Sequence, residues 1–520
     1  MDPIEMMVTD LNSEYLGLSR LCLMESAGKS LSDEIAKIVT FNFSKPVKIA
    51  IFTGSGGNAG DGFVAARYLL NRGFEVEIFM LSKQENLKSD NAKTNFEILT
   101  NMEPRISRLK THVIETNDDV NNLKLNCEEY IIVDAILGTG IEGKLKTKVK
   151  NVIELINKSN SFIVSADIPS GLDPLTGETK DIAIIPNYTI TFHRIKTGVK
   201  KAGEDKVGGI VTCDIGIPIE AEYFTGFGDL IKLNHRGIYS HKGNNGKLLI
   251  VGGSKDYSGA PAIAGLAAIS SGSDLVYVTS PDPASLAIKA TSPDLIVKGL
   301  KGDYLTLDNL DEILEYVDKV DAVLIGPGAS LNEETGKLFN VLVNKIKKPL
   351  VLDADALKLV DLSLIKDRED IILTPHLFEF KRFFSKVMDE EEINSNNLEL
   401  SLDTYDYDKI NENISIFQSI VSSIKGTVII KGQFDLVVNS KRFKINKTGN
   451  PGMTVGGTGD ALSGLTTSLL SQGLNAFDSA TLAIYLNGRA GDLAMNKQGY
   501  GFSATDITDY IGALMANIIK

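Results

Sequence analysis

Residues 46–81, PVKIAIFTGSGGNAGDGFVAARYLLNRGFEVEIFML, decide the fold of the first half of the chain. An apolar run leads into a Gly-rich turn, which is followed by a stretch with helical spacing and by a second apolar run. Short apolar runs that end in Gly-rich turns are typical of buried parallel strands. The stretch therefore predicts a strand, a loop, a helix and a strand of a doubly wound α/β domain, whose ligands are expected at the C-terminal ends of the strands.

The same pattern continues along the first half of the chain. Further apolar runs end in Gly-rich or acidic loops, and the last of them has the composition of a final strand: EYIIVDAILGTG (129–140), SFIVSADIPSGLD (161–173), YTITFH (188–193) and GGIVTCDIGIP (208–218). The residues that follow show no clear period. We therefore expect a Rossmann-like three-layer α/β domain over residues 1–225.

A second α/β pattern fills residues 226–520. Its motifs each join an apolar run to a Gly-rich or polar loop: HKGNNGKLLIVGGSKDYSGAP (241–261), DAVLIGPGAS (321–330), KPLVLDADAL (348–357), DIILTPHLFEF (370–380) and GTVIIKGQFDLVVN (426–439). Between the last two, residues 388–414 are acidic, rich in Asn and poor in apolar residues. We interpret most of that segment as a solvated surface excursion.

Length and charge exclude several classes of protein. A chain of 520 residues is too long for one hydrophobic core and suggests at least two domains. A net charge of -13 argues against a basic face for nucleic acid and against binding to an anionic membrane. It leaves a nucleotide ligand open, because Gly-rich backbone binds phosphate without net positive charge.

The cysteines and the N-terminal segment indicate a compartment. Cys22, Cys127 and Cys213 are far apart and form no CxxC pair, so a disulfide framework or a zinc site is not expected. The first residues, MDPIEMMVTDLNSEY, have early acids and no apolar run of the signal-peptide type. No stretch approaches the roughly 20 apolar residues that span a bilayer. We expect a cytoplasmic protein and a homo-oligomer.

The first Gly-rich loop, GSGGNAGDG (54–62), passes for a dinucleotide fingerprint. Glu75 or Glu77 lies about 20 positions further on, as the fingerprint requires. An ordinary dehydrogenase is therefore one interpretation. A plain pyrophosphate turn has no need of Asn58 and Asp61, however, and these two residues favour a different chemistry.

Polar side chains follow the predicted strands at three further points. Asn58, Asp134 and Ser170 offer only hard oxygen ligands, which suit an alkali or alkaline-earth cation better than zinc. Asp167, at a predicted strand end, is a plausible acid/base. The structural alternative is that these side chains cap helices and satisfy turn backbone.

Four motifs in order, LMESAG (23–28), GSGGNAGDG, VDAILGTGIEG (133–143) and ADIPSGLD (166–173), resemble the YjeF N-terminal domain of NAD(P)H-hydrate epimerases. The resemblance implies that Asn58, Asp134 and Ser170 hold K⁺ and that Asp167 is the catalytic acid/base. It implies that two loops line the substrate site: Gly57, Asn58, Ala59, Gly60 and Asp61, and Gly138, Thr139, Gly140, Ile141, Glu142, Gly143 and Lys144. The family usually has two consecutive Asn residues in the first loop, and here Gly57 replaces the first.

The stretch NPGMTVGGTGDALSG (450–464) places a carboxylate beside a predicted anion site. A Gly-rich turn that feeds a helix N-terminus binds phosphate through backbone N–H groups. Phosphoryl transfer also needs a base for the acceptor hydroxyl, and Asp460 can serve as that base. The structural alternative is that Asp460 is simply the N-cap of the helix.

The GGTGDALSG motif resembles the ribokinase-like superfamily, and with the other motifs of residues 230–520 it resembles the ADP/ATP-dependent NAD(P)H-hydrate dehydratases. Two departures are visible: Ser330 replaces the last Gly of a GPGxG pattern, and HLFEF (376–380) replaces HPGE. The resemblance implies substrate contacts from Ala260, Gly328, His376 and Asp460. It implies that the phosphoryl donor contacts Lys431, Gly432, Gln433, Phe434, Asp435 and Gly459.

The fused interpretation is nicotinamide nucleotide repair. The substrates are then the hydrates NADHX and NADPHX, whose two epimers the first half interconverts, while the second half dehydrates one epimer with ADP or ATP. Mg²⁺ is expected with the donor by analogy with other phosphoryl transfers, and the resemblance to prokaryotic members favours ADP. Two rivals remain: a kinase that stably phosphorylates a small alcohol, and a catalytically inactive binding module in the first half.

Overall fold

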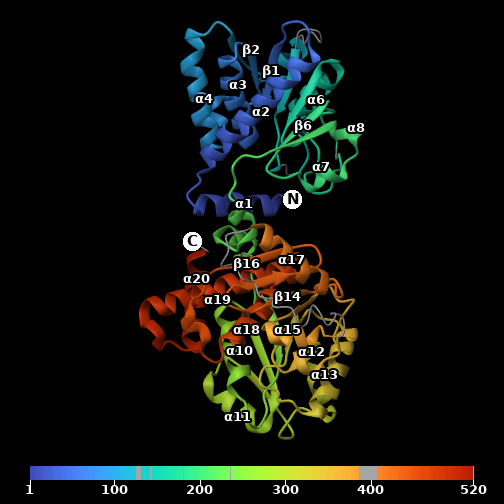
Figure 1. Cartoon of the computed structure of the whole chain (residues 1–520), viewed down its shortest axis with the longest axis vertical. Helices are drawn as coiled ribbons and strands as arrows, with labels where there is room; N and C mark the ends of the chain where they lie inside the picture. Colours follow the sequence, from blue (N-terminus) through green and yellow to red (C-terminus); the bar gives the residue numbers. More distant parts are fainter. Residues whose placement is uncertain (124–129, 141–142, 180, 235, 386–406, 519–520) are drawn as a thin grey trace. The chain divides into compact units, whose positions relative to one another are not determined.

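The computed structural model describes residues 1–123, 130–140, 143–179, 181–234, 236–385 and 407–518 (Figure 1). The chain divides into two compact units, Met1–Glu222 and Tyr223–Lys520. This division lies close to the boundary that the sequence placed after residue 225. No helix among the described residues is long and apolar enough to cross a membrane.

The first unit is built on a seven-stranded parallel sheet of order β3-β2-β1-β4-β5-β6-β7. Its strands are β1 (Lys48–Thr53), β2 (Glu75–Met80), β3 (Leu109–Val113), β4 (Tyr130–Ala135), β5 (Phe162–Ala166), β6 (Tyr188–Phe192) and β7 (Gly209–Cys213). Its helices are α1 (Pro3–Tyr15), α2 (Arg20–Asn42), α3 (Gly57–Asn71), α4 (Asp90–Met102), α5 (Asn117–Asn122), α6 (Thr147–Lys158), α7 (Thr197–Lys201) and α8 (Glu204–Val207), and α9 (Ile219–Tyr223) contains the division between the units.

Each face of this sheet is covered by helices. The apolar side chains of α2, α3 and α4 pack on one face, and those of α5 and α6 pack on the other. Figure 1 labels α2, α3, α4 and α6 around this sheet. Strands buried on both faces read as continuous apolar runs, which is why β1, β4 and β5 were visible in the sequence. The predicted three-layer α/β class is therefore confirmed for this unit.

The strand order reverses between β1 and β4. β1 pairs with β2 on one side and with β4 on the other, and Thr53 lies level with both Met80 and Ala135. The loops that follow β1 and β4 therefore diverge at the same edge of the sheet. Ligands of doubly wound sheets bind in the crevice at such a reversal.

The second unit has a nine-stranded sheet of order β10-β9-β8-β11-β12-β13-β14-β15-β16, in which β15 is antiparallel to both of its neighbours. Its strands are β8 (Lys247–Val251), β9 (Leu275–Pro281), β10 (Ile296–Leu300), β11 (Ala322–Ile325), β12 (Leu350–Leu352), β13 (Ile371–Leu373), β14 (Thr427–Ile430), β15 (Asp435–Val438) and β16 (Phe443–Asn446). The strand order reverses between β8 and β11.

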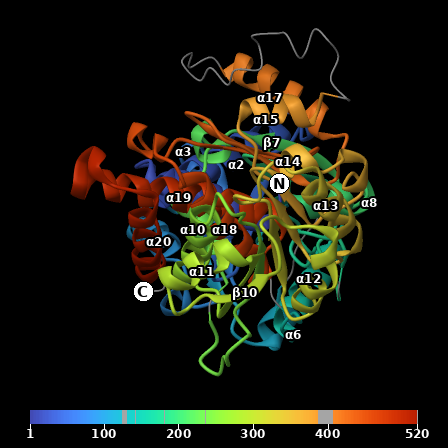
Figure 2. The same cartoon turned by 90° about the horizontal axis from the view of Figure 1, so that it is seen from below.

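Helices cover both faces of the second sheet as well. One face carries α10 (Gly259–Ser270), α11 (Asp282–Thr291), α18 (Thr458–Ser471), α19 (Ala476–Gln498) and α20 (Ala504–Ile518). The other carries α12 (Leu310–Val317), α13 (Glu333–Lys345), α14 (Ala356–Leu359), α15 (Leu377–Phe383) and α17 (Tyr407–Val421). Figure 2 shows α10 beside α18. The predicted α/β class is confirmed here too.

The prediction of a solvated excursion over residues 388–414 is wrong at its C-terminal end. Residues 388–406 lie outside the described residues, but α17 begins at Tyr407. Ile410 and Ile414, one helical turn apart, are buried in the core of the second unit. The many Asp and Asn residues around them masked this short apolar stripe.

Candidate functional site

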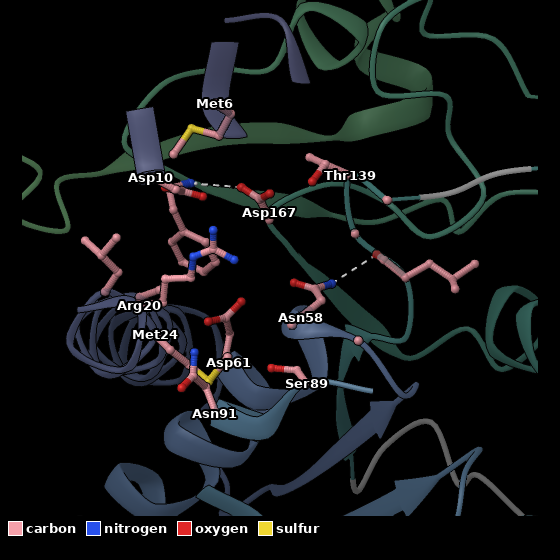
Figure 3. A pocket seen from close by; sticks show the side chains of 18 of the residues that line it. Met6, Asp10, Arg20, Met24, Asn58, Asp61, Ser89, Asn91, Thr139 and Asp167 are labelled. Carbon is pink, nitrogen blue, oxygen red and sulfur yellow. Dashed lines mark hydrogen bonds between the residues drawn. The ribbon is translucent and has the colours of Figure 1, made fainter. Parts of the chain in front are cut away.

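A cavity of about 540 Å³ opens in the first unit at the edge where β1, β4 and β5 end (Figure 3). Its lining brings together seven residues that the sequence placed at the epimerase substrate site: Gly57, Asn58, Asp61, Gly138, Thr139, Gly140 and Asp167. Strand ends in this sheet are adjacent although their residues are far apart in the chain. The cavity therefore lies where the strand order predicts a ligand.

The glycines of the first loop serve different purposes. A Cβ on Gly54 would lie 2.0 Å from the carbonyl oxygen of Ile136, so only glycine permits the chain to pass this close where it leaves β1 and β4. A Cβ on Gly60 would meet the sulfur of Met24, so this glycine lets α2 pack on α3. A Cβ on Gly57 would meet nothing within 4 Å. The usual Asn would therefore fit at Gly57.

Other predicted lining residues lie elsewhere. Ala59 and Gly60 are buried in α3, behind the cavity. Gly143 and Lys144 are exposed and are not part of the cavity lining. Ile141 and Glu142 lie outside the described residues.

The three predicted K⁺ ligands converge. The Asn58 amide nitrogen donates to the carbonyl oxygens of Leu137 (3.0 Å) and Ala166 (3.1 Å), which leaves its Oδ1 for a cation. The Ser170 hydroxyl also contacts the Leu137 oxygen (3.3 Å) and donates to Oδ1 of Asp134 (2.5 Å). Three hard oxygen donors thus share one buried region, as an alkali cation requires.

Asp134 carries a fully buried carboxylate. It accepts hydrogen bonds from the hydroxyl of Ser165 and from the backbone amides of Ile136 and Ser170, so it satisfies turn backbone as the structural alternative predicted. Burial raises the pKa of Asp134, while hydrogen bonds from Ser170 and Ser165 lower it. No salt bridge compensates its charge among the described residues. A buried charge of this kind is stabilised by a cation, so the residues fit K⁺.

Asp167 ends β5 and is held by a buried lysine. Its φ of 64° lies in the left-handed region, which is uncommon for a non-glycine residue and typical of functional sites. One carboxylate oxygen accepts hydrogen bonds from the Lys196 ammonium, from the Thr191 hydroxyl (3.3 Å) and from the Phe192 amide (3.2 Å). This arrangement fixes the carboxylate with its other oxygen free.

Two more carboxyl groups face the same cavity. Asp10 extends from α1 and Asp61 from α3 (Figure 3). Burial raises the pKa of Asp10 to about 6, with Lys196 opposing the shift. Burial, followed by the charge of Asp167, raises the pKa of Asp61 well above its usual range. The cavity therefore holds three acids and one buried lysine.

The dehydrogenase interpretation does not have the required geometry. Glu75 begins β2 and pairs with Lys48 at the start of β1, at the end of the sheet opposite to the Gly-rich loop. Glu77 accepts a hydrogen bond from the hydroxyl of Tyr130, which is the first residue of β4 (3.1 Å). The two glutamates have the sequence spacing of a dinucleotide fingerprint. The acid of such a fingerprint lies at the C-terminal end of the second strand, however, and Glu75 and Glu77 lie near its start.

In the second unit, two helix N-termini lie together. A Cβ on Gly464 of α18 would meet Ala264 of α10, and one turn further along both helices Ser468 donates to the Ala268 carbonyl (3.3 Å). The helices therefore run in the same direction with their N-termini at the same end. Gly457, with φ 96°, begins α18, and its carbonyl accepts the first intrahelical bond, from Ala461. The backbone amides before Ala461, at the start of the helix, have no intrahelical partner and are therefore available for an anion.

Asp460 lies in the first turn of α18, and its N-cap is Gly457, so the interpretation of Asp460 as an N-cap is wrong. Burial, followed by the charge of Asp353, raises the pKa of Asp460 to about 7, against the opposing charge of Lys431. The Lys431 ammonium is engaged by the buried carboxylate of Asp353 at 3.1 Å. Asp460 is thus a carboxyl poised to accept a proton near neutral pH.

The predicted substrate contacts of the second unit form two groups. Gly328, with φ 63°, follows β11, and a Cβ there would lie 3.4 Å from Cβ of Ala260 and 3.1 Å from Cβ of Tyr257. Ser330 also has a positive φ, 69°, and is held by hydrogen bonds to Ser254 and Asp355. Position 330, where the family usually has glycine, therefore has a backbone conformation that favours glycine in this chain too.

His376 belongs to the second group, with the predicted donor contacts. It is the N-cap of α15, where its Nδ1 accepts from the Glu379 amide (3.3 Å). It pairs in register with Lys431, the residue after β14. A Cβ on Gly459 would lie 3.4 Å from the Lys431 ammonium, so the lysine, the glycine turn and Asp460 are adjacent.

The loop after Lys431 is more exposed. Gly432 and Gln433 are exposed, and Phe434 is partly buried. Asp435 begins β15 and accepts hydrogen bonds from the Gly432 amide and the Asn446 side chain, while burial raises its pKa to about 6. Within the described residues, no group of three or more His, Cys, Asp or Glu side chains could hold a metal ion.

Sequence reasoning missed three side chains that complete these sites. Lys196 follows the strand YTITF, so the logic applied to other strand ends could have found it. Asp353 lies in the quoted motif VLDADAL but was given no role. Asp10 gave no signal, because it lies on a helix before the α/β pattern begins.

Comparison with known proteins gives matches to both units. The family model of YjeF-related protein N-terminus matches residues 20–198, and the family model of NAD(P)H-hydrate dehydratase matches residues 248–513. The helix that carries Asp10 precedes the first match.

Relatives cover nearly the whole chain. The bifunctional NAD(P)H-hydrate repair enzyme of Methanothermobacter thermautotrophicus is 45% identical over 99% of this chain and 95% of that protein. The enzyme of the same name from Archaeoglobus fulgidus is 37% identical over 98% of this chain and 96% of that protein. Among solved structures, an ADP/ATP-dependent NAD(P)H-hydrate dehydratase from Bacillus subtilis, co-crystallized with ATP/Mg²⁺, is 22% identical with a TM-score of 0.45, over 57% of this chain and 98% of that chain.

Proposed function

The chain belongs to the bifunctional NAD(P)H-hydrate repair enzymes, and on that premise we propose how the residues of its two units divide the chemistry. The first unit is the epimerase, and the second is the nucleotide-dependent dehydratase. NADH and NADPH gain water across a ring double bond and give a hydrate with two epimers at the hydroxyl-bearing carbon. The second unit repairs one epimer, and the first returns the other to it.

The observation that carries the dehydratase assignment is the place of Asp460. A carboxyl with a pKa of about 7 lies in the first turn of α18, beside amides that can bind phosphate. We assign to Asp460 the removal of the proton from the ring hydroxyl, whose oxygen then attacks the terminal phosphorus of the donor. The donor P–O bond breaks, and the backbone N–H groups of residues 456–459 stabilise the transferred charge.

The second half of that reaction is an elimination. Phosphate is a far better leaving group than hydroxide, so the ring nitrogen lone pair expels it as the C–O bond breaks. Loss of a proton from the neighbouring carbon restores the double bond of the dihydronicotinamide. In this assignment Ala260, Gly328 and His376 bind the hydrate. Lys431, Gly432, Gln433, Phe434, Asp435 and Gly459 bind the donor.

In the epimerase, Asp167 is assigned as an acid/base at the hydroxyl-bearing carbon. The free oxygen of its fixed carboxylate faces the cavity that Gly57, Asn58, Asp61 and Thr139 line. K⁺ would be held by Asn58, Asp134 and Ser170. Bound there, it would compensate the buried charge of Asp134 and stiffen the loops after β1 and β4.

The donor is inferred from the family resemblance, and the compartment from the cysteines. The resemblance to prokaryotic members favours ADP over ATP, with Mg²⁺ bound through the donor phosphates. We also propose a cytoplasmic location, since Cys22 and Cys213 are free thiols.

One assay tests both units. A mixture of both NADH-hydrate epimers is incubated with Mg²⁺, K⁺ and either ADP or ATP, and the return of dihydronicotinamide absorbance is followed. We expect full recovery and release of free phosphate, with ADP the faster donor. Recovery that stalls near half would contradict the epimerase assignment. A stable phosphate ester in place of free phosphate would favour the small-alcohol kinase instead.

A further inference from the structure

The epimerase cavity holds more acid–base groups than one catalytic residue requires. Asp167, Asp61 and Asp10 reach it from β5, α3 and α1, which are separated in the chain but meet at this edge of the sheet (Figure 3). Lys196 is the buried cation among them. The question is how the carboxyl groups differ.

Asp167 and Asp61 have opposite environments. Asp167 accepts hydrogen bonds from the Lys196 ammonium, a hydroxyl and a backbone amide, all at one carboxylate oxygen. The Asp61 carboxyl has no hydrogen bond or salt bridge among the described residues, although it points into the cavity from a sheltered position on α3. Burial, followed by the neighbouring charges of Asp167 and Asp10, raises its pKa well above the usual range, which favours the acid form of this carboxyl.

Inversion at the hydroxyl-bearing carbon needs one acid and one base. Because this carbon is bonded to the ring nitrogen, its C–O bond can break with help from the nitrogen lone pair. The departing hydroxyl must take up a proton, and the water that re-enters from the opposite face must lose one. A carboxyl without a hydrogen-bond partner among the described residues and a carboxyl bound by an ammonium, both in one cavity, match these two demands.

We propose that Asp61 and Asp167 divide this work: Asp61 protonates the departing hydroxyl, and Asp167 takes the proton of the entering water. The Asp61 proton passes to the hydroxyl oxygen, the C–O electron pair leaves with water, and a carbon–nitrogen double bond forms. Water then forms a C–O bond on the other face, the double-bond pair returns to nitrogen, and Asp167 receives the proton. One proton has moved from Asp61 to Asp167, and both carboxyls re-equilibrate with solvent. Lys196 is a positioning residue, because it orients Asp167.

The proposal rests on the proposed epimerase function, and its test separates the two. Full-length wild type and Asp61→Asn are given one NADH-hydrate epimer in water enriched in ¹⁸O, without a phosphoryl donor, and the enzyme-free rate is subtracted. Epimerisation by HPLC and ¹⁸O uptake by mass spectrometry are followed together. Wild type is expected to gain one ¹⁸O per inversion.

Asp61→Asn is expected to lose about 10²- to 10⁴-fold in kcat for epimerisation, with KM within about threefold. A purely structural role would instead raise KM or lower the melting temperature. Asp61→Glu, which keeps the acid one methylene further out, is expected to retain part of the activity. Asp118→Asn, the same change at an exposed position of α5, is the matched control and is expected to behave as wild type.

Three outcomes would overturn parts of the argument. Wild type that does not epimerise at all would overturn the proposed function itself. Active wild type with Asp61→Asn within twofold of it would overturn the acid role of Asp61 and leave the function in place. Inversion without ¹⁸O uptake would show that the C–O bond stays intact, and would overturn the proposed step.

Discussion

Asp167 of the first unit and Asp460 of the second each lie near a lysine, yet the two lysines are used differently. Lys196 binds Asp167 directly. Lys431 instead binds the buried Asp353, and Asp460 is left with a pKa of about 7, which burial raises first and the charge of Asp353 raises further. A nearby lysine therefore does not fix the state of a catalytic carboxyl. What matters is which carboxylate the lysine contacts.

The comparison implies that Asp460 is needed for proton removal in the second unit alone. Asp460→Asn keeps the shape of the side chain but removes the base, so dehydration is expected to fall by about 10²- to 10⁴-fold. Epimerisation should stay at the wild-type rate. Free phosphate release and the interconversion of the two epimers are measured on the same preparation. Loss of both activities would mean that the variant is misfolded.

Lys196 tests the other half of the comparison. Lys196→Met leaves a poorly exposed carboxylate without its partner, and removal of one member of a buried pair typically costs about 3–5 kcal/mol. We expect a lower melting temperature for the transition of the first unit, together with slow epimerisation. The double variant Lys196→Met with Asp167→Asn should melt nearer to wild type, because the unpaired charge is gone. If it does not, Lys196 acts mainly through packing.

The pH dependence of dehydration tests whether the surroundings of Asp460 set its pKa. Because the ionised carboxyl is the active base, dehydratase kcat should be full above pH 7 and fall as the pH drops through about 7. Asp353→Asn removes a charge that raises this pKa and frees Lys431 to lower it, so the fall should move to lower pH. The midpoint of the pH profile should remain above the ordinary carboxyl range, because Asp460 stays buried. An unchanged or higher midpoint would contradict this account of the site.

Ser330 and Gly57 are two of the three departures from the family motifs, and restoring the usual residue at each is expected to change stability by different amounts. Ser330 has φ 69°, so Ser330→Gly should stabilise the second unit by about 1 kcal/mol in denaturant or thermal unfolding, less whatever its hydrogen bond to Ser254 contributes. A destabilised variant would show that this hydrogen bond outweighs the backbone strain.

Gly57→Asn is expected to have the smallest effect. A side chain there meets open space, so stability should stay within about 0.5 kcal/mol and the epimerase KM should fall slightly if the usual Asn contacts substrate. Gly54→Ala is the matched contrast, because its Cβ would lie 2.0 Å from a carbonyl oxygen. Thermal unfolding should separate the two variants clearly, and equal effects would contradict the close approach of Gly54 to the Ile136 carbonyl.

The missed strands show why periodicity finds some elements and not others. The central strands β1, β4 and β11 are buried on both faces and appear as apolar runs. β3, with the sequence LKTHV, and β10, with IVKGL, are edge strands; β3 is largely exposed, and β10 is mostly only partly buried. An edge strand needs little apolar surface, so its sequence resembles a loop. The stripe of Ile410 and Ile414 was hidden in the same way.

The sequence by itself determined the α/β class, the glycine turns at the strand ends, and the motifs that identify the family. These are local properties, since a strand, a turn or a helix start is specified by residues a few positions apart. Only the tertiary structure decided which charged groups meet. Asp10 joins Asp61 and Asp167 because α1 packs at that edge, and Asp460 has a raised pKa because it is buried and lies near the charge of Asp353. Burial and charge depend on distance in space, and the chain brings these groups together from far apart in the sequence.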